Sequence, residues 1–393
     1  MNLQESQYLL ARIREMMNEQ PENLTDERAL QMIENYVFCH PRSSGRSCYE
    51  NGALVQKLFL TLRRELGILQ PLADDPAISE IMVNGTNRIF VERSGVLEQT
   101  EIAFDSAAEL EELIRRIASR VHREINELNP IVDARLSDGS RVNAVLSGIA
   151  LGGPALTIRK FPAGSPMQMQ DLIDRGTITP EAAKLLQKLV RARYNCFVSG
   201  GTSSGKTTFL NVLSRSIPPD ERIIVIEDSA ELKLDHIRNV VRLECRSANV
   251  QGRGGVDMSH LVRSSLRMRP DRIIVGEVRG EEVMHMIQAM NTGHDGSMST
   301  GHANSVSGML KRLEAMFLQA ADIPVDAIRR QLVEGIDIII HMMRMRDGSR
   351  RVSEISELDT IKNGEITTNC LYRHGTGLTG NKLIHKSKLE VWS

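Results

Sequence analysis

Eight consecutive residues in the second half of the chain have the spacing of a loop that wraps around phosphate. They are Gly200, Gly201, Thr202, Ser203, Ser204, Gly205, Lys206 and Thr207, which fit the pattern GxxxxGK[ST] and are followed by Thr208. Glycines let backbone N–H groups turn inward, and a helix N-terminus favours negative charge. Lys206 can reach terminal phosphates, and the Thr207 hydroxyl can ligate Mg²⁺. A chance match in a glycine-rich turn is the alternative; the apolar strand predicted before the loop and the helix after it favour phosphate binding.

Three further polar clusters follow predicted strands. Glu227 and Asp228 end the run RIIVI, Glu277 ends DRIIVG, and His302 lies at the end of SMST. Because the carboxyl ends of parallel strands share one edge of a sheet, we expect these side chains to converge on the phosphate loop. Transfer of a phosphoryl group to water needs a positioned base and neutralised charge, which this set supplies. The alternative for each residue is a satisfied structural side chain.

Two arginines in the first half of the chain belong to the same argument. Arg141 and Arg159 lie on predicted strands just before a predicted linker. An arginine held across a domain boundary can stabilise the charge of a transition state. The alternative is an ordinary surface ion pair.

A second group of basic residues surrounds the predicted end of a helix near Pro270. It consists of Arg263, Arg267, Arg269 and Arg272. Such a cluster can bind nucleic acid, but its acidic neighbour Asp271 favours a solvated face or a subunit contact. The composition agrees: 49 Lys and Arg balance 50 Asp and Glu, and aromatic residues are 4%. A dedicated nucleic-acid binder usually has an excess of basic residues and aromatic side chains on which bases stack, and this composition provides neither.

The chain before the phosphate loop is predicted to contain three regions. Apolar residues at helical spacing predict a helical extension over residues 1–57, interrupted by a mobile connection at 40–52. Residues 58–161 are predicted to form a small α+β domain. Residues 162–178, which contain most of the segment FPAGSPMQMQ with its two prolines, are predicted to be a linker.

The α+β prediction rests on a change of period. Apolar and polar residues alternate around Asn84-Gly85 and Ser94-Gly95, which indicates antiparallel strands joined by short turns. Residues 110–121 then have an apolar helical face. Two further strands are predicted at 140–146 and 155–161.

From residue 179 to 360 the pattern predicts a different domain. A helix begins after Thr179-Pro180, and short apolar strands then alternate with helices. Such strands indicate a mainly parallel sheet covered on both faces, so the fold class is α/β. Asp347-Gly348 predicts a closing hairpin. We assign no element to the tail, residues 361–393.

The five cysteines and the apolar runs indicate in which cellular compartment the protein is expected. The cysteines are Cys39, Cys48, Cys196, Cys245 and Cys370, an odd and widely spaced set. This favours a reducing cytosol over a secreted disulfide framework, and the residues around Cys39 do not complete a zinc site. The N-terminus has no signal-peptide pattern, and the longest uncharged run, 142–158, is broken by glycines and Pro154. We therefore expect any membrane association to be peripheral.

Four motifs in order resemble those of the secretion ATPase superfamily, which drives type II and type IV secretion and type IV pili. Besides the phosphate loop, IIVIEDSAEL resembles its aspartate box, RMRPDRIIVGEVRG its Walker B region and GSMSTGHANS its histidine box. The runs RPDRIIVGEVRGEE and AMNTGHDGSMSTGHANS look closest to the CpaF/TadA branch, associated with tight-adherence pili. The resemblance covers residues 58–358. It implies an N-terminal α+β domain, a linker and a RecA-like P-loop NTPase domain, assembled as a homo-hexamer.

The resemblance also implies roles for the residues above. Residues Gly200 to Thr208 and Asp228 would bind ATP, with Thr207, Glu227 and Glu277 at the Mg²⁺ ion. Glu277 would also activate the attacking water. It follows that ATP and Mg²⁺ are the expected substrate and cofactor.

Further roles are implied for one histidine and the two arginines. His302 would sense or stabilise the γ-phosphate, and Arg141 and Arg159 would act from the N-terminal domain. One departure is Ser147-Gly148, where the family usually has two prolines. This is expected to loosen the turn leading to Arg159.

We therefore expect a cytoplasmic motor, peripheral at the inner membrane, that hydrolyses ATP to power a pilus or a type II/IV secretion machine. Its expected partners are polytopic inner-membrane platform proteins, with no specific nucleic acid. A RecA-like nucleic-acid motor and a non-catalytic ring scaffold are the alternatives. Stimulation by DNA or RNA would favour the first, and nucleotide binding without turnover the second.

Overall fold

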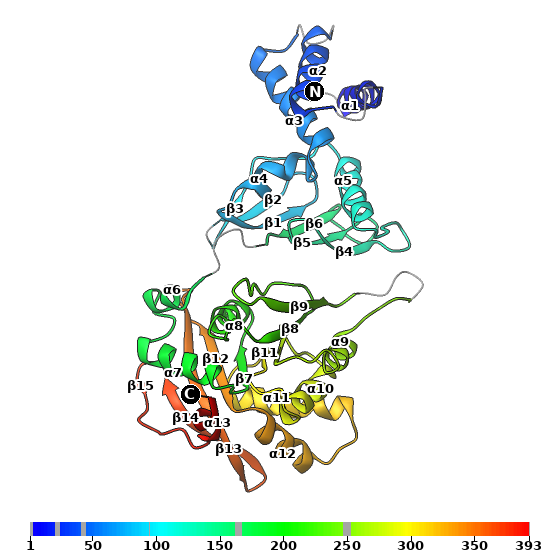
Figure 1. Cartoon of the computed structure of the whole chain (residues 1–393). Helices are drawn as coiled ribbons and strands as arrows, with labels where there is room; N and C mark the ends of the chain where they lie inside the picture. Colours follow the sequence, from blue (N-terminus) through cyan, green and yellow to red (C-terminus); the bar gives the residue numbers. More distant parts are fainter. Residues whose placement is uncertain are drawn as a thin grey trace. The chain divides into compact units, whose positions relative to one another are not determined.

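The computed structural model describes residues 3–19, 24–40, 45–93, 95–161, 167–246 and 253–392. The chain separates into two compact units, Met1–Gly164 and Ser165–Ser393, and each is described by itself. Figure 1 shows the elements of both units. Within the described residues, no helix is both long and apolar enough to cross a membrane.

Three helices begin the first unit and share a small core of their own. They are α1 (Leu3–Asn18), α2 (Asp26–Cys39) and α3 (Cys48–Arg63). Thr25 caps α2, and α3 begins with a capping box in which Ser47 Oγ accepts from Glu50 N and Glu50 Oε2 accepts from Ser47 N. The expected mobile connection at 40–52 is therefore wrong in its second half, because this capping box starts α3 within it. Residues 41–44 lie outside the described residues.

A six-stranded antiparallel sheet follows, with the order β3-β2-β1-β6-β5-β4. Its strands are β1 (Ile78–Asn84), β2 (Ile89–Arg93), β3 (Val96–Gln99), β4 (Ile131–Arg135), β5 (Arg141–Val145) and β6 (Ala155–Arg159). Three further elements precede or cover it: η2 (Gly67–Leu69), α4 (Gln70–Asp74) and α5 (Ala107–Arg120). One face packs on α5 through a core that includes Val142 and Ile158. The α+β class is confirmed; β4 was not predicted, because its only buried residue is Val132.

Arg141 and Arg159 are direct partners across β5 and β6. They therefore share one face of this sheet, opposite the buried side chains of Val142 and Ile158. The turn between these strands is tied to α5, because Ser147 Oγ donates to Glu111 Oε1 at 2.6 Å. Of the predicted turn Ser94-Gly95, Ser94 lies outside the described residues.

The second unit is built on a nine-stranded sheet with the order β15-β14-β13-β12-β7-β11-β10-β8-β9. From β12 to β9 neighbouring strands are parallel, and from β12 to β15 they are antiparallel. The strands are β7 (Cys196–Gly200), β8 (Arg222–Glu227), β9 (Asn239–Glu244), β10 (Arg272–Val275), β11 (Met298–His302), β12 (Ile338–Arg344), β13 (Arg350–Lys362), β14 (Glu365–Arg373) and β15 (Gly377–Leu378). The predicted α/β class with a mainly parallel sheet is confirmed.

Helices cover both faces of this sheet. They are α6 (Met169–Asp174), α7 (Pro180–Arg191), α8 (Lys206–Ser214), α9 (Met258–Ser265), α10 (Glu282–Asn291), α11 (Val306–Ala320), α12 (Val325–Gly335) and α13 (Ser387–Trp392). One core joins α7 and α8 to the sheet, and a second core on the other face joins α9 to α12. Such two-sided cover explains why the central strands are continuous apolar runs.

Two expected boundaries look different in the structure. Helix α6 lies within the expected linker 162–178, of which 162–166 are outside the described residues. The unassigned tail 361–393 continues the sheet through β14 and β15 and ends in α13. Asp347-Gly348 does turn the chain between β12 and β13, as predicted.

The expectation for the basic cluster near Pro270 is wrong for Arg272. Its side chain is fully buried at the start of β10. Arg272 Nε and Nη2 bind Glu221 at 2.6 and 2.9 Å, and Nη1 donates to the carbonyl of Val190 at 2.6 Å. A Cβ on Gly296 would lie 2.4 Å from Nη1, so only glycine fits beside it. The guanidinium thus joins β10 to α7 inside the fold.

We predict that Arg272→Leu lowers the free energy of unfolding by about 3 kcal/mol, because the buried Glu221 carboxylate loses two hydrogen bonds and keeps the more distant Arg193, 3.5 Å away. Urea unfolding monitored by circular dichroism measures this change. Arg272→Leu combined with Glu221→Leu should recover part of the loss, since the buried carboxylate that lost its hydrogen bonds is then removed. A single variant as stable as the wild type would contradict the buried pair.

Candidate active site

The phosphate loop connects the end of β7 to the start of α8. Gly200 is the last residue of β7, and Lys206 is the first residue of α8. Gly205 precedes the helix with φ +89° and has no side chain to cap it, so the first N–H groups of α8 point toward the loop. Ser203 also has a positive φ, +57°. These local conformations give the loop the shape of an anion-binding nest.

The loop is packed against itself at Gly200 and Gly201. A Cβ on Gly200 would lie 2.5 Å from Ser204 Oγ and 2.6 Å from the carbonyl of Met342. The carbonyl of Gly201 accepts from Ser204 Oγ and from Lys206 Nζ, each at 2.9 Å. The first glycine is therefore required by close packing, and the second supplies the acceptor that holds the lysine.

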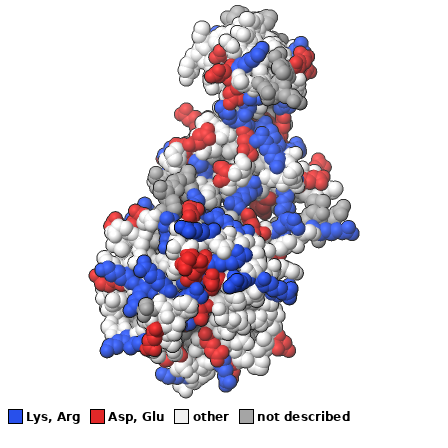
Figure 2. Space-filling view, in the orientation of Figure 1, with Lys and Arg blue, Asp and Glu red and all other residues white. Residues whose placement is uncertain are grey.

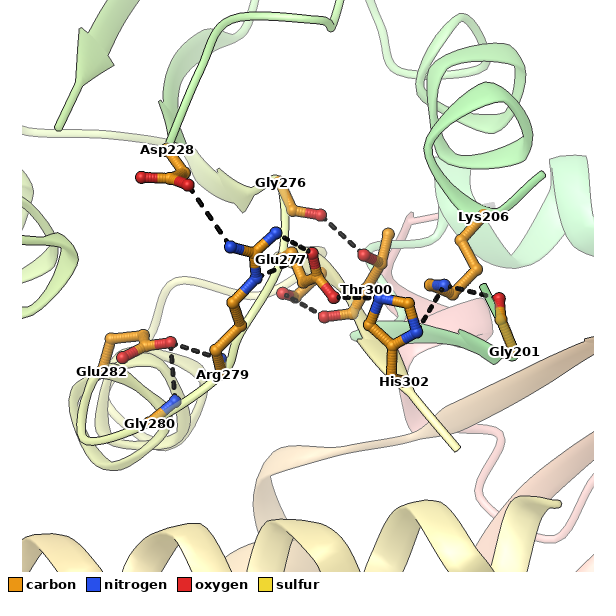
Figure 3. A network of polar contacts seen from close by, with 11 residues as sticks. Gly201, Lys206, Asp228, Gly276, Glu277, Arg279, Gly280, Glu282, Thr300 and His302 are labelled. Carbon is orange, nitrogen blue, oxygen red and sulfur yellow. Dashed lines mark hydrogen bonds and ion pairs between the residues drawn. The ribbon is translucent and has the colours of Figure 1, made fainter. Parts of the chain in front are cut away.

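Lys206, His302 and Glu277 meet at this edge of the sheet (Figure 3). Lys206 Nζ lies 3.3 Å from His302 Nδ1, and His302 Nε2 lies 2.8 Å from Glu277 Oε1. Burial and the neighbouring Lys206 lower the pKa of His302, although Glu277 raises it. This favours a neutral imidazole whose Nδ1 accepts from Lys206. Burial likewise lowers the pKa of Lys206, and Glu277 opposes the change.

The other oxygen of Glu277 faces an arginine that the sequence did not single out. Arg279 Nε and Nη2 donate to Glu277 Oε2 at 3.0 and 2.7 Å, and Nη1 reaches Asp228 Oδ2 at 3.3 Å. Figure 3 shows Arg279 between the two carboxylates. Hydrogen bonding to Glu277 raises the pKa of Arg279. The signal that could have found it is its position two residues after a glutamate at a strand end.

Glu227, which is expected at the metal, has one carboxylate oxygen bound inside the protein. It is buried at the end of β8, and its Oε1 accepts from the backbone N–H groups of Glu231 and Leu232 at 2.8 and 3.1 Å. A Cβ on Gly276 would lie 2.9 Å from Glu227 Cγ, so the glycine before Glu277 makes room for this side chain. Burial raises the pKa of Glu227, and these backbone hydrogen bonds lower it. In this structure Glu227 shapes the loop that carries Asp228.

Further contacts, which sequence reasoning missed, brace the phosphate loop from β12 and β13. Arg350 Nε donates to the carbonyl of Ser203 at 3.2 Å. Behind the loop, Ser199 Oγ and His341 Nδ1 lie 2.8 Å apart in the interior. Burial lowers the pKa of His341, which favours a neutral ring.

The residues at this edge fit a phosphate and a divalent cation. Lys206 is almost fully buried, and among the described residues no ion pair joins it to a carboxylate, so an anion would complete its environment. Glu277 Oε1 is buried and, within the described part of the chain, faces His302 Nε2 at 2.8 Å; a carboxylate oxygen can accept a second hydrogen bond. The remaining acceptor position suits a bound water or ion. Thr207, at the start of α8, is half-buried.

The remaining predicted residues are exposed beside the phosphate loop or belong to the first unit. Thr202, Ser203 and Thr208 are exposed on the loop and α8. Arg141 and Arg159 belong to the other unit, so they are described only within their own sheet. Among the described residues, no group of three or more His, Cys, Asp or Glu side chains is arranged to hold a metal alone. A Mg²⁺ site here would depend on phosphate oxygens, as is common for nucleotide enzymes.

The chain is similar in sequence to known proteins. Residues 63–387 match the family described as "Type II/IV secretion system protein". A putative conjugal transfer protein of Mycobacterium tuberculosis is 37% identical over 298 residues, covering 74% of this chain and 84% of that protein. The type IV secretion system protein VirB11 of Brucella suis is 32% identical over 316 residues, covering 73% and 87%.

A solved structure shows the same fold at lower identity. The pilus retraction motor PilT, crystallised with ADP, has a TM-score of 0.57 and 23% identity, covering 75% of this chain and 83% of that one. At this identity the likeness concerns the fold alone. The extent of the family match and the conjugal transfer relative together show that this chain belongs to the type II/IV secretion system protein family.

Proposed function

We propose that this chain is an ATP-hydrolysing motor of a type II/IV secretion, conjugal transfer or type IV pilus machine. The observation that carries the proposal is the continuous contact from Lys206 through His302 to Glu277 beside the phosphate loop. This contact joins a phosphate-binding cation to a carboxylate that can accept a proton. An ATPase needs both groups within reach of the terminal phosphate.

The phosphate loop binds and orients the substrate in this proposal. Backbone N–H groups at the start of α8 bind the phosphates of ATP, and Lys206 moves its ammonium from the carbonyl of Gly201 to the terminal phosphates. Thr207 would hold Mg²⁺ through its hydroxyl. The ion, when bound, neutralises charge on the transferred phosphoryl group.

Glu277 acts on the attacking water. Its Oε1 is buried, lies on the side of His302 and Lys206, and has an unused acceptor position. A water held there can give its proton to the carboxylate as it attacks. His302, neutral and bonded to Lys206, orients Glu277 relative to the phosphate and responds when the lysine moves.

The aspartate box takes a supporting part. Asp228 is exposed beside Arg279 and is proposed to contact nucleotide or metal through water. Glu227 was expected at the metal; its contacts to Glu231 and Leu232 favour the role of fixing the Asp228 loop. Its carboxylate remains close to Gly276, next to Glu277 in the chain.

We further propose that Arg141 and Arg159 act on the nucleotide in a homo-hexameric ring. Their shared position on one sheet face lets both guanidinium groups reach the same anion. Hexamer formation and the CpaF/TadA, tight-adherence assignment rest on the sequence resemblance. So do the cytoplasmic location, peripheral at the inner membrane, and the polytopic platform proteins as partners.

The alternatives have less support. For a nucleic-acid motor, the protein lacks a global positive charge, with a formal net charge of −1. Figure 2 shows acidic and basic side chains interspersed over the visible face of the second unit. For a non-catalytic scaffold ring, the intact Lys206, Thr207 and Glu277 are unfavourable. Turnover assays with and without DNA or RNA separate these readings.

We predict that Lys206→Ala lowers ATP turnover at least about a hundredfold, because it removes the cation aimed at the transferred phosphoryl group. Phosphate release from the purified protein measures the effect. Near-normal turnover in a folded variant would refute the assignment of the phosphate loop as the site of hydrolysis.

Glu277→Gln separates binding from chemistry. The amide keeps the shape of the side chain but is a poor base, so hydrolysis should fall by about 10²–10⁴-fold while Mg-ATP still binds. Titration with a fluorescent ATP analogue, run beside phosphate release, tests both. Loss of binding with the fold intact would instead make Glu277 a metal ligand or a structural residue.

Arg159→Ala tests the N-terminal arginines. Because arginine contacts to a transferring phosphoryl group contribute up to ~10³–10⁵ in rate, we expect turnover to fall at least about tenfold. Lys160→Ala is the matched control. Lys160 donates to the carbonyl of Asp75 at 2.5 Å, within its own unit, and its loss should change turnover little. Equal rates for both variants would make Arg159 an ordinary surface charge.

A further inference from the structure

Arg279 contacts two carboxylates of the candidate active site, and phosphate binding alone does not explain these contacts. It donates twice to one oxygen of Glu277 and once to Asp228, and its side chain is 60% exposed. Glu277 is more enclosed, with 19% of its side chain exposed. The arginine therefore covers the carboxylate from the solvent side and connects it to the aspartate box (Figure 3).

The backbone that carries Arg279 is fixed by another carboxylate. Glu282 Oε1 accepts from the backbone N–H groups of Arg279 and Gly280, at 2.5 and 3.0 Å. On the other side, Val278 N donates to the carbonyl of Thr300 at 2.9 Å. The backbone of the loop after β10 is thus hydrogen-bonded on both sides of Arg279. The Cα of Arg279 therefore has a fixed position.

We propose that Arg279 is a positioning residue: it holds Glu277 in the rotamer that turns Oε1 toward the phosphate loop. This inference rests on the proposed function, because it assigns a partner to the residue that acts on water. A glutamate side chain has free rotation about its single bonds, and restricting it costs conformational entropy. Because the guanidinium binds Oε2 with two N–H groups, it fixes the carboxylate with Oε1 turned to His302, where one acceptor position remains for a water.

Because Arg279 is exposed, we expect its substitution to affect the rate of hydrolysis more than the stability of the protein. Exposed ion pairs contribute little to stability, so a variant should fold normally. Misplacing a catalytic group by about 1 Å can lower a rate ~100-fold, so the same variant should be slow. Lysine keeps the charge but cannot form the two-N–H fork, so it should restore only part of the rate.

The test compares Arg279→Gln and Arg279→Lys with the wild type, using Arg242→Gln as the matched control. Arg242 is an exposed arginine whose nearest acidic partner, Asp235, lies 4.0 Å away. We expect Arg279→Gln to lower kcat by ~30–100-fold, with the Kd of a fluorescent ATP analogue and the unfolding midpoint unchanged. Arg279→Lys should fall between the two, and Arg242→Gln should match the wild type.

A double variant shows whether Arg279 acts through Glu277. Adding Arg279→Gln to Glu277→Gln should lower the residual rate no further, because the base is already absent. A multiplicative loss would overturn the proposal, as would a wild-type kcat for Arg279→Gln. A weakened Kd at unchanged kcat would also overturn it, by making Arg279 a direct nucleotide contact. Failure of the wild type to hydrolyse ATP would refute the proposed function itself, which these comparisons among active proteins do not test.

Discussion

The register between β11 and β7 places His302 directly beside Gly200, and the candidate active site depends on this pairing. A shift by one residue would turn the imidazole to the other face of the sheet, away from Lys206. The next strand, β10, is in register with β8 up to Val275 and Ile226, so the chain leaves the sheet at Gly276 beside Glu227. Parallel strand pairing thus brings side chains from separate segments of the chain together at one edge of the sheet.

At this edge of the sheet, the positions of Lys206 and Glu277 keep the two opposite charges from pairing directly. Lys206 and Glu277 are both largely buried, yet they contact each other only through His302. A direct ion pair would bind each group to the other and leave neither for a phosphate or a water. The histidine keeps them apart, and Arg279 takes the outer oxygen of the glutamate. The result is a cation and a carboxylate that are joined through the imidazole and are not paired directly with each other.

Sequence patterns predicted the parts of this site that have a local signature. The phosphate loop needs glycine at fixed positions, and the carboxyl ends of apolar strands identify Glu277 and His302. Arg279 and Arg272 could not be distinguished in the same way, although both are arginines near β10. One is fully buried against Glu221, and the other is exposed over Glu277. Their difference is set by packing across the sheet, which a single sequence does not encode in a short pattern.

The tail, residues 361–393, is a second case in which long-range contacts are not visible in a short sequence pattern. Its polar, glycine-rich sequence predicts no element, yet its polar groups form long-range hydrogen bonds. Backbone N–H groups of Ile384 and His385 donate to the buried carboxylate of Glu357. Lys388 then binds Asp337, which itself accepts from a backbone N–H group at the start of β7. This network closes the edge of the sheet opposite the phosphate loop. β7, which ends at the phosphate loop, is therefore held at its other end through Asp337 and the Lys388 side chain of α13.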